Sequence, residues 1–175
     1  YLYLSSNTHK ESEVTNNDNY LLINPTLTFW LAMAPDSAHE IFGDMDLQSK
    51  QLIFMPVSDS EDMESAGSGS HWSLVVYHKS SDTFYSYDSH QNHNEGAARR
   101  LAKAMSPLVS KKFKFESRRT PQQTNGADCG CFVLAITQYL MEHAGDDSQL
   151  VSDGECVTNV SKLRSTILNL LGSLL

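Results

Sequence analysis

Residues 121–140 read PQQTNGADCGCFVLAITQYL, and this stretch decides how we interpret the rest of the chain. The Asn125-Gly126 pair is a strong turn signal. After it, apolar side chains recur at helical spacing, which predicts a helix that ends near Gly145 with His143 in its last turn. The apolar positions are Cys131, Phe132, Ala135, Ile136, Tyr139 and Leu140. The sequence therefore places a turn directly before a buried helix.

Cys129 falls in the first turn of this predicted helix. Asp128 is the natural N-cap, and we expect its carboxylate to accept hydrogen bonds from free backbone N–H groups. Unpaired amides and the helix dipole at this end favour a thiolate, which is the nucleophilic form of cysteine. The alternative is a buried structural cysteine, because free cysteine is among the most buried residue types. The local sequence leaves both interpretations open.

Two further segments offer the partners that a nucleophilic thiol needs. His71 opens HWSLVVY, an apolar run typical of a buried strand, after a Gly/Ser/acidic loop over residues 58–70. TFYSYDSH alternates like a second strand and carries Asp88 near its end. A hairpin turning at residues 79–82 would bring the histidine and the aspartate onto adjacent strands. A nucleophilic thiol needs a base, and the base needs an orienting carboxylate; Cys129, His71 and Asp88 fit these three roles. Their spacing along the chain does not by itself show that they meet in the fold.

Gln123 lies six residues before Cys129, on the other side of the Asn125-Gly126 turn. A turn there can fold its side-chain amide back beside the thiol. Its N–H and the backbone N–H of Cys129 would then face the place where an oxyanion develops. The alternative is a solvated loop glutamine like its neighbour Gln122, whose side chain we expect to point away from the site.

The order of the motifs HW, YDS, PQQ-x-NG and DCG resembles the Ulp/sentrin-specific cysteine protease family, which processes ubiquitin-like modifiers. The matching residues are His71, Trp72, Tyr87, Asp88, Ser89, Pro121, Gln122, Gln123, Asn125, Gly126, Asp128, Cys129 and Gly130. The resemblance is strongest from Leu52 to Leu140 and is closest to the deneddylase branch, which acts on the neddylation modifier. It implies an α+β, papain-like cysteine protease fold of the ubiquitin-like-protease type, with a central mixed sheet flanked by helices.

The resemblance also implies a function. The protein would be a cysteine protease or isopeptidase that cleaves after the C-terminal Gly-Gly of a ubiquitin-like modifier. Cys129 would attack the carbonyl, and His71 would carry its proton. Asp88 would orient the histidine, and Gln123 would help to bind the oxyanion. Trp72 would lie beside the narrow channel for the glycine tail, unless it is simply a core residue.

Two features depart from the family pattern. Ala127 stands where an aromatic residue often precedes Asp-Cys. The family's N-terminal Trp-Leu-Asn/Asp segment, which helps to roof the channel, has no counterpart in the sequence. Trp30 stands in a different context, LTFWLAM, and we expect it to be a core residue of a helix. We therefore expect residues 1–175 to form one catalytic domain that lacks this N-terminal segment.

Two other functions are compatible with the same residues. Effector acetyltransferases that resemble this family move an acetyl group through an equivalent Cys-His-Asp set. They would need a coenzyme site, and the sequence offers no basic patch suited to its phosphates. A non-catalytic modifier-binding domain is the second alternative. We expect no cofactor, because Cys129-x-Cys131 with the nearby His90 and His93 lacks the second ligand pair typical of a zinc site.

The composition is that of an ordinary globular domain, with 40% hydrophobic and 19% charged residues. The net charge of −8 argues against nucleic acid and favours a basic partner. An acidic cluster either contributes to such binding or is a solvated loop; it comprises Asp59, Glu61, Asp62 and Glu64. No apolar run is long enough to cross a bilayer, and no signal peptide is visible. Three cysteines suit a reducing cytoplasm or nucleus, and we expect a monomer.

The remaining patterns predict the other elements. Short helices are expected over residues 25–34 and after a capping box of Ser37 and Glu40. Strands are expected over residues 51–57 and, half exposed, over residues 112–119. A helix should begin at Glu95 and end at Met105 before Pro107, and Tyr1–Leu4 resembles the end of another. The last helix should pack through one apolar face, formed by Val160, Leu163, Ile167, Leu170 and Leu171.

Overall fold

The computed structural model describes residues 19–43, 45–62, 69–151 and 154–173. The strands are β1 (Tyr20–Leu22), β2 (Leu52–Ser58), β3 (Trp72–His78), β4 (Thr83–Tyr87) and β5 (Phe115–Ser117). The helices are α2 (Pro25–Met33), α3 (Ala38–Phe42), α4 (Glu95–Val109), α5 (Cys129–Glu142) and α6 (Glu155–Ser173). Short 3-10 helices cover Pro35–Ser37 and Leu47–Ser49. The helical segment expected at Tyr1–Leu4 lies outside the described residues.

The strands form one mixed sheet in the order β1-β2-β3-β4-β5. The central strands β2, β3 and β4 are antiparallel, and the outer strands β1 and β5 run parallel to their neighbours. The predicted turn at residues 79–82 joins β3 to β4. In the register of this hairpin Leu74 lies opposite Tyr87. His71, just before β3, and Asp88, just after β4, therefore lie at the same edge of the sheet.

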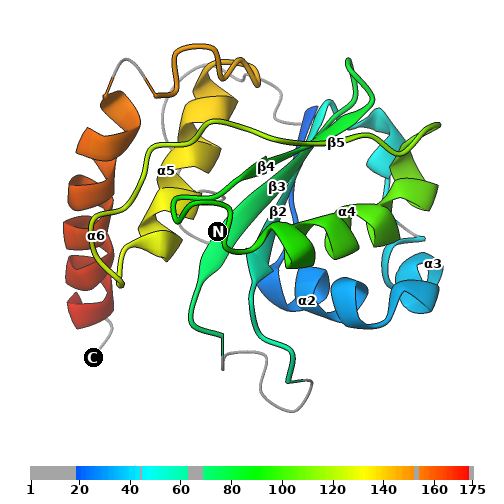
Figure 1. Ribbon diagram of the computed structural model, residues 1–175, viewed down its shortest axis with the longest axis horizontal. Coiled ribbons are helices and arrows are strands. Elements are labelled where there is room, and N and C mark those ends of the chain that lie inside the picture. The colour runs from blue at the N-terminus through cyan, green and yellow to red at the C-terminus, as the bar shows by residue number, and fades with distance from the viewer. Residues whose placement is uncertain (1–18, 44, 63–68, 152–153, 174–175) are drawn as a thin grey trace.

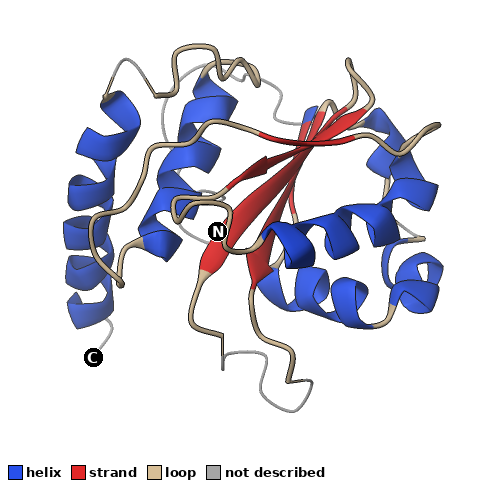
Figure 2. Ribbon diagram, in the orientation of Figure 1, coloured by secondary structure: helices blue, strands red, loops and turns tan. Residues whose placement is uncertain are grey.

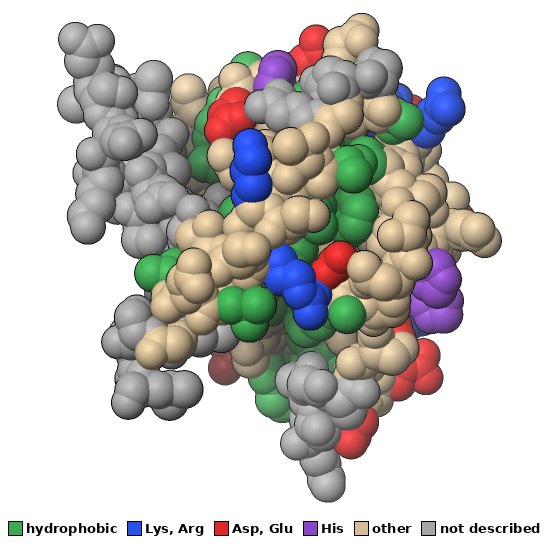
Figure 3. Space-filling view, turned by 90° about the vertical axis from the view of Figure 1, so that its left-hand side faces the viewer, with side chains coloured by type: hydrophobic (Ala, Val, Ile, Leu, Met, Phe, Trp, Pro, Cys, Tyr) green, Lys and Arg blue, Asp and Glu red, His purple; other side chains and the backbone are tan. Residues whose placement is uncertain are grey.

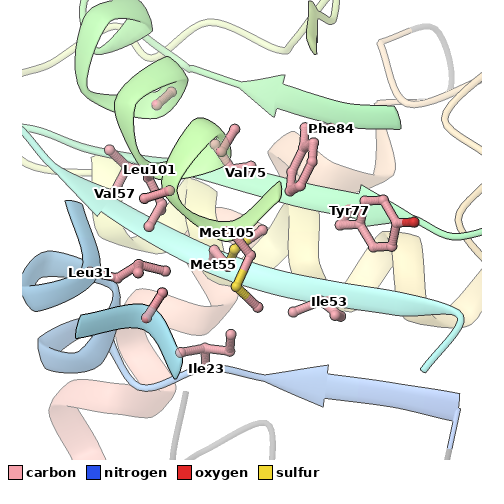
Figure 4. Close-up of a cluster of buried hydrophobic side chains, with 14 of the residues drawn as sticks. Ile23, Leu31, Ile53, Met55, Val57, Val75, Tyr77, Phe84, Leu101 and Met105 are labelled. Atoms are coloured by element: carbon pink, nitrogen blue, oxygen red, sulfur yellow. The ribbon is translucent and has the colours of Figure 1, made fainter. Parts of the chain in front are cut away.

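Helices cover both faces of the sheet, so the molecule has three layers (Figures 1 and 2). The alternation of side chains along each strand explains why both faces are apolar. In β2, Ile53 and Met55 face the core on the side of α2, α3 and α4, while Leu52 and Phe54 face α5 and α6. Figure 4 shows the first of these cores, in which Leu101 and Met105 of α4 lie over the side chains of β2 and β3.

The end of α4 differs from the prediction, because the helix continues past Pro107 to Val109. A proline removes one backbone donor and normally stops a helix. Here the last turn is kept by other groups. The Gln48 side chain donates to Leu108 O at 2.5 Å, and the Tyr77 hydroxyl donates to Val109 O at 2.9 Å. These distant side chains satisfy the carbonyl groups that the helix end leaves free.

Four smaller predictions were wrong. Ser37 forms no side-chain cap, because it ends a 3-10 helix with a ψ of 3° rather than the extended conformation of an N-cap. Trp30 is 40% exposed, since the buried face of α2 carries its neighbours Phe29 and Leu31. Leu170 is 46% exposed near the end of α6, where only the earlier turns reach the core. β5 is limited to Phe115–Ser117, the residues that pair with β4.

The other expected elements are present with small shifts of their ends. Asn24 caps α2, and its side chain accepts from Thr26 N at 2.8 Å. Val160 and Leu163 are buried, as expected for the core face of α6, and Ile167 is partly buried. The side chain of Leu171 lies outside the described residues. Among the described helices, none is both long and apolar enough to span a lipid bilayer.

Candidate active site

His71 and Asp88 meet at the edge of the sheet, as the sequence predicts. His71 Nε2 lies 2.6 Å from Asp88 Oδ1, and both side chains are buried. The carboxylate also accepts from the backbone N–H groups of His90 and Asn94, each at 2.8 Å. These bonds fix the carboxylate against the imidazole ring. Because Nε2 is hydrogen-bonded to Asp88, Nδ1 is the ring nitrogen that can accept a proton from a thiol.

Asn94 binds the segments that carry both His71 and Asp88. The sequence analysis did not identify this residue. Its buried side-chain amide donates to Val57 O and to His71 O, each at 3.3 Å. One residue thus holds the backbone of His71 through its side chain and the carboxylate of Asp88 through its backbone. The only local signal is its position directly before α4, where an asparagine suggests a helix cap. Its side chain makes no such cap, because it is used for the strand carbonyls instead.

Gln123 is tied to Ser89, the residue after Asp88. Its backbone N–H donates to Ser89 O at 2.8 Å, and the Ser89 hydroxyl donates to Gln123 Oε1 at 2.8 Å. The side-chain Nε2 donates to Asn125 O at 2.7 Å. An amide nitrogen carries two hydrogens, so one N–H remains for another acceptor. The serine therefore fixes which side of the amide presents its donors.

Gln122 does not point away from the site, so that expectation was wrong. Its Nε2 donates to Asp88 O at 3.0 Å and to Thr120 O at 2.9 Å, while its Oε1 accepts from Gln91 N at 2.8 Å. The side chain joins two loops that are close in space but distant in sequence. The Gln122 side chain is bound by backbone groups of nearby loops, and such contacts leave no periodic pattern in the sequence. Gln122 is therefore part of the frame around Asp88.

Cys129 is the first residue of α5 and is 7% exposed. Asp128 stands at the N-cap, but its carboxylate accepts from no backbone N–H of the helix, so the predicted side-chain cap was wrong. The carboxylate is instead bound by the Asn125 amide at 2.7 Å and by the Arg164 guanidinium of α6. Both contacts, with the asparagine first, hold the pKa of Asp128 below its ordinary value. The first-turn amides of α5 are left unblocked by this carboxylate.

The first turn of α5 lies at the end of the molecule where β3 begins (Figure 1). Side chains of α5, among them Phe132 and Ile136, share a core with Leu74 and Val76 of β3. Trp72 lines an apolar groove of about 350 Å³ together with Pro25, Pro56, Ala127, Gly130, Cys131, Val133, Leu134 and Ile167. Chain neighbours of His71 and Cys129 thus meet in one groove. Figure 3, which views the side of the molecule with α6, shows hydrophobic side chains gathered in a hollow there.

The second thiol of the motif, Cys131, is suited to packing rather than to nucleophilic attack. Burial, followed by the nearby Asp128 carboxylate, raises the pKa of its thiol. Trp72 is only partly buried and faces the same groove, so it is not simply a core residue. In the described part of the chain, no group of three His, Cys, Asp or Glu side chains is arranged to hold a metal ion.

Asp59, the first residue of the acidic cluster before His71, has a structural role. Asp59 accepts from Ser70 N at 2.7 Å, from Ser70 Oγ at 2.6 Å and from His71 N at 3.0 Å. Its carboxylate therefore fixes the backbone at the start of β3. Glu61 pairs with Arg100 at 3.5 Å on the surface, and Glu64 lies outside the described residues.

Comparison with known proteins agrees with this geometry. Residues 26–165 match the Ulp1 protease family, C-terminal catalytic domain, and the chain belongs to this family. NEDD8-specific protease 1 of Arabidopsis thaliana is 37% identical over 147 residues, which cover 81% of this chain and 62% of that protein. Sentrin-specific protease 8 of Homo sapiens is 28% identical over 132 residues, or 73% of this chain and 61% of that protein. The chain thus matches less than two thirds of the length of these curated relatives.

Solved structures support the expected fold. A structure of SUMO protease Ulp1, with its catalytic cysteine oxidised to a sulfonic acid, has a TM-score of 0.61 at 20% identity. The match covers 81% of this chain and 65% of that one. A de-sumoylating protease has a TM-score of 0.59 at 16% identity, covering 99% of this chain and 79% of the other. At these identities the likeness concerns the fold alone, and the predicted α+β fold of this protease type is confirmed.

Proposed function

We propose that this protein is a cysteine isopeptidase that cleaves after the C-terminal Gly-Gly of a ubiquitin-like modifier, of the NEDD8 type in particular. The observation that carries the proposal is the buried His71–Asp88 pair at 2.6 Å, at the edge where the helix headed by Cys129 packs on the sheet. The choice of modifier is supported by relatives named NEDD8-specific protease 1 and sentrin-specific protease 8.

The residues divide the chemistry as follows. His71 Nδ1 takes the thiol proton, and Cys129 Sγ attacks the carbonyl carbon of the terminal glycine, giving a tetrahedral oxyanion. Gln123 and the backbone N–H of Cys129 donate to that oxygen. The C–N bond then breaks as His71 gives its proton to the departing amine, leaving a thioester on Cys129. Water, deprotonated by His71, attacks the thioester, which releases the modifier carboxylate and restores the thiol.

Asp88 and Trp72 have supporting roles in this scheme. Asp88 keeps Nε2 of His71 bonded and stabilises the imidazolium that forms during proton transfer. Trp72 lines the same groove as Gly130, so its ring is suited to restrict a channel there to residues without side chains. A glycine tail fits such a channel, because glycine alone lets two backbones or a backbone and a ring approach closely.

The protein's partners on this proposal are the modifier and its conjugates, with neither nucleic acid nor membrane required. We further propose that it acts as a monomer in the cytoplasm or nucleus. All three cysteines are free thiols, which suits a reducing compartment where a nucleophilic cysteine stays active.

A panel of modifiers carrying a C-terminal fluorophore tests the proposal directly. We expect hydrolysis of the NEDD8 substrate above SUMO and ubiquitin, and a modifier with a C-terminal electrophile should label Cys129. The Cys129→Ala variant is the matched control and should be neither active nor labelled. If Cys129 stayed unlabelled while the modifier still bound, the chain would be a binding domain. Acetyl transfer from a coenzyme thioester, without hydrolysis, would identify an acetyltransferase instead.

A further inference from the structure

Arg164 of α6 reaches across to the loop that carries the nucleophile. Its Nη1 donates to Asp128 Oδ1 in a short ion pair and lies 3.4 Å from Ala127 O. Arg164 and Asp128 are 36 positions apart in sequence. Asn125 binds the other carboxylate oxygen, and its own Oδ1 accepts from the backbone N–H groups of Ala127 and Asp128 at 2.9 and 3.1 Å. Asn125 belongs to the same loop as Asp128, whereas Arg164 binds the loop from α6.

The carboxylate of Asp128 stands directly before the proposed nucleophile in the chain. The Asp128 backbone has a ψ of 1° rather than the extended conformation of a capping residue, and its carboxylate makes no bond to the first-turn amides. An unpaired carboxylate here would place a negative charge next to the Cys129 sulfur and next to the developing oxyanion, which would disfavour both. Arg164 is the cation that pairs with this carboxylate.

We propose that Arg164 is a positioning residue for the active site, where it balances the negative charge of the Asp128 carboxylate next to Cys129 and holds that carboxylate toward α6. This inference rests on the proposed isopeptidase function only for its catalytic readout. The same contact gives α6 a role in the chemistry, although α6 itself contributes no reacting group. The pair is partly exposed, with side-chain exposures of 47% for Arg164 and 18% for Asp128, so its direct contribution to stability is small.

The test is a double-mutant cycle on the full 175-residue chain. Arg164→Met removes the charge and keeps the length of the side chain. Asp128→Ala removes the carboxylate, and the double variant removes both. Lys162→Met, an exposed lysine on the same helix, is the matched control for loss of charge. Arg164→Lys keeps a cation that can still pair with Asp128, and it should retain most of the rate.

Two readouts are measured for each variant. The first is kcat and KM on the preferred modifier substrate. The second is the rate at which iodoacetamide alkylates Cys129 at neutral pH, followed by mass spectrometry of the peptide that contains it. We expect Arg164→Met to lower kcat about ten-fold with little change in KM, because the unpaired Asp128 carboxylate then opposes the oxyanion that develops beside it. It should also slow the alkylation, because a free carboxylate disfavours the thiolate.

The decisive result is the double variant, which should regain the kcat and alkylation rate of Asp128→Ala alone. A purely structural arginine would not be rescued by removing its partner. If the double variant stayed as slow as Arg164→Met, or if Arg164→Met matched the wild type in both assays, the inference would be overturned. If no modifier substrate were cut by the wild type, the proposed function would fail, and the order of alkylation rates would still decide the role of Arg164.

Discussion

The two ends of α5 are built in opposite ways. At the C-terminal end, backbone groups close the helix: His143 N donates to Tyr139 O at 3.0 Å, and Gly145 N donates to Leu140 O at 2.7 Å. Gly145 has a φ of 88°, and a Cβ there would lie 2.8 Å from the His78 ring, so the position requires glycine. At the N-terminal end, the Asp128 carboxylate makes no bond to the first-turn amides.

An aspartate–arginine pair stands near each end, with different consequences. Asp147, which follows the C-terminal end, accepts from Arg118 Nε at 2.6 Å and Nη2 at 2.5 Å, and from the buried Tyr87 hydroxyl at 3.0 Å. This pair ties the loop after α5 to the sheet. The Asp128–Arg164 pair instead places a cation on the carboxylate next to Cys129. The comparison indicates that one pair fixes the loop after α5 to the sheet, while the other balances charge beside the proposed nucleophile.

The largest expected effect is at the reactive end. Cys129→Ala should abolish hydrolysis of the modifier substrate and leave binding of the modifier intact, because it removes the thiol and changes little volume. Steady-state turnover and isothermal titration with the modifier measure the two properties. Cys131→Ala and Cys156→Ala are the controls and should stay active. An inactive Cys131→Ala beside an active Cys129→Ala would show that we named the wrong nucleophile.

The next effect concerns the oxyanion. Gln123→Ala should lower kcat by about 10²–10³ and leave KM nearly unchanged, the cost expected for one lost oxyanion donor. Gln123→Glu should be at least as slow, since a negative charge opposes the developing oxyanion. Thr124→Ala, an exposed neighbour, is the control, because Gln122 is bonded to Asp88 and no longer serves as one. A rise in KM alone would make Gln123 a substrate-binding group.

At the closed end we expect a change in stability without a change in chemistry. Asp147→Ala leaves the buried Tyr87 hydroxyl and Arg118 without their carboxylate, and should lower the free energy of unfolding by about 2–3 kcal/mol. Urea denaturation measures this, and kcat/KM of the folded enzyme should match the wild type. Asp146→Ala, whose carboxylate bonds within its own loop to Ser148 N, should cost much less. A fall in kcat comparable to that of Gln123→Ala would contradict the separation of the two ends.

The smallest effect is a pH dependence at the same closed end. Burial lowers the pKa of His78 from 6.5 to about 4, so the unfolded chain binds a proton there that the folded chain excludes. Stability should therefore fall as the pH drops from 6.5 toward 4, by about 1 kcal/mol between pH 7 and 5.5 from this residue. His78→Gln should flatten this part of the profile in urea denaturation across pH. The exposed His39→Gln control should leave the slope as it is, and an unchanged slope in His78→Gln would disprove the assignment.

Elements set by local residues could be predicted from the sequence. Asn24 before Pro25 marked a helix start, and the apolar runs of β2 and β3 marked buried strands. The turn at residues 79–82 was enough to place His71 beside Asp88. Each of these signals depends on residues close together in the chain, where backbone preference and periodicity decide the outcome.

Several of the failures share a different cause, which is hydrogen bonding to polar groups that are distant in the sequence. Pro107 did not end α4, because Gln48 and Tyr77 bind the carbonyls of its last turn. Asp128 did not cap α5, because its backbone has a ψ of 1° and its carboxylate is bound by Asn125 and Arg164. Asn94 was missed for the same reason, since its partners lie on other elements. Hydrogen bonds of this kind follow from tertiary packing and leave no period in the sequence.

The tight hairpin of β3 and β4 has a consequence for the order in which the site is assembled during folding. Contacts between residues close in sequence form quickly, whereas those that close long loops pay more chain entropy first. His71 and Asp88 are 17 residues apart and joined by one hairpin, so we expect their pairing among the early native contacts. Cys129 can join them only after the chain has passed through α4 and β5 and α5 has docked. The acid–base pair would thus exist before the nucleophile arrives, and late docking of one helix would switch the protein from inert to reactive.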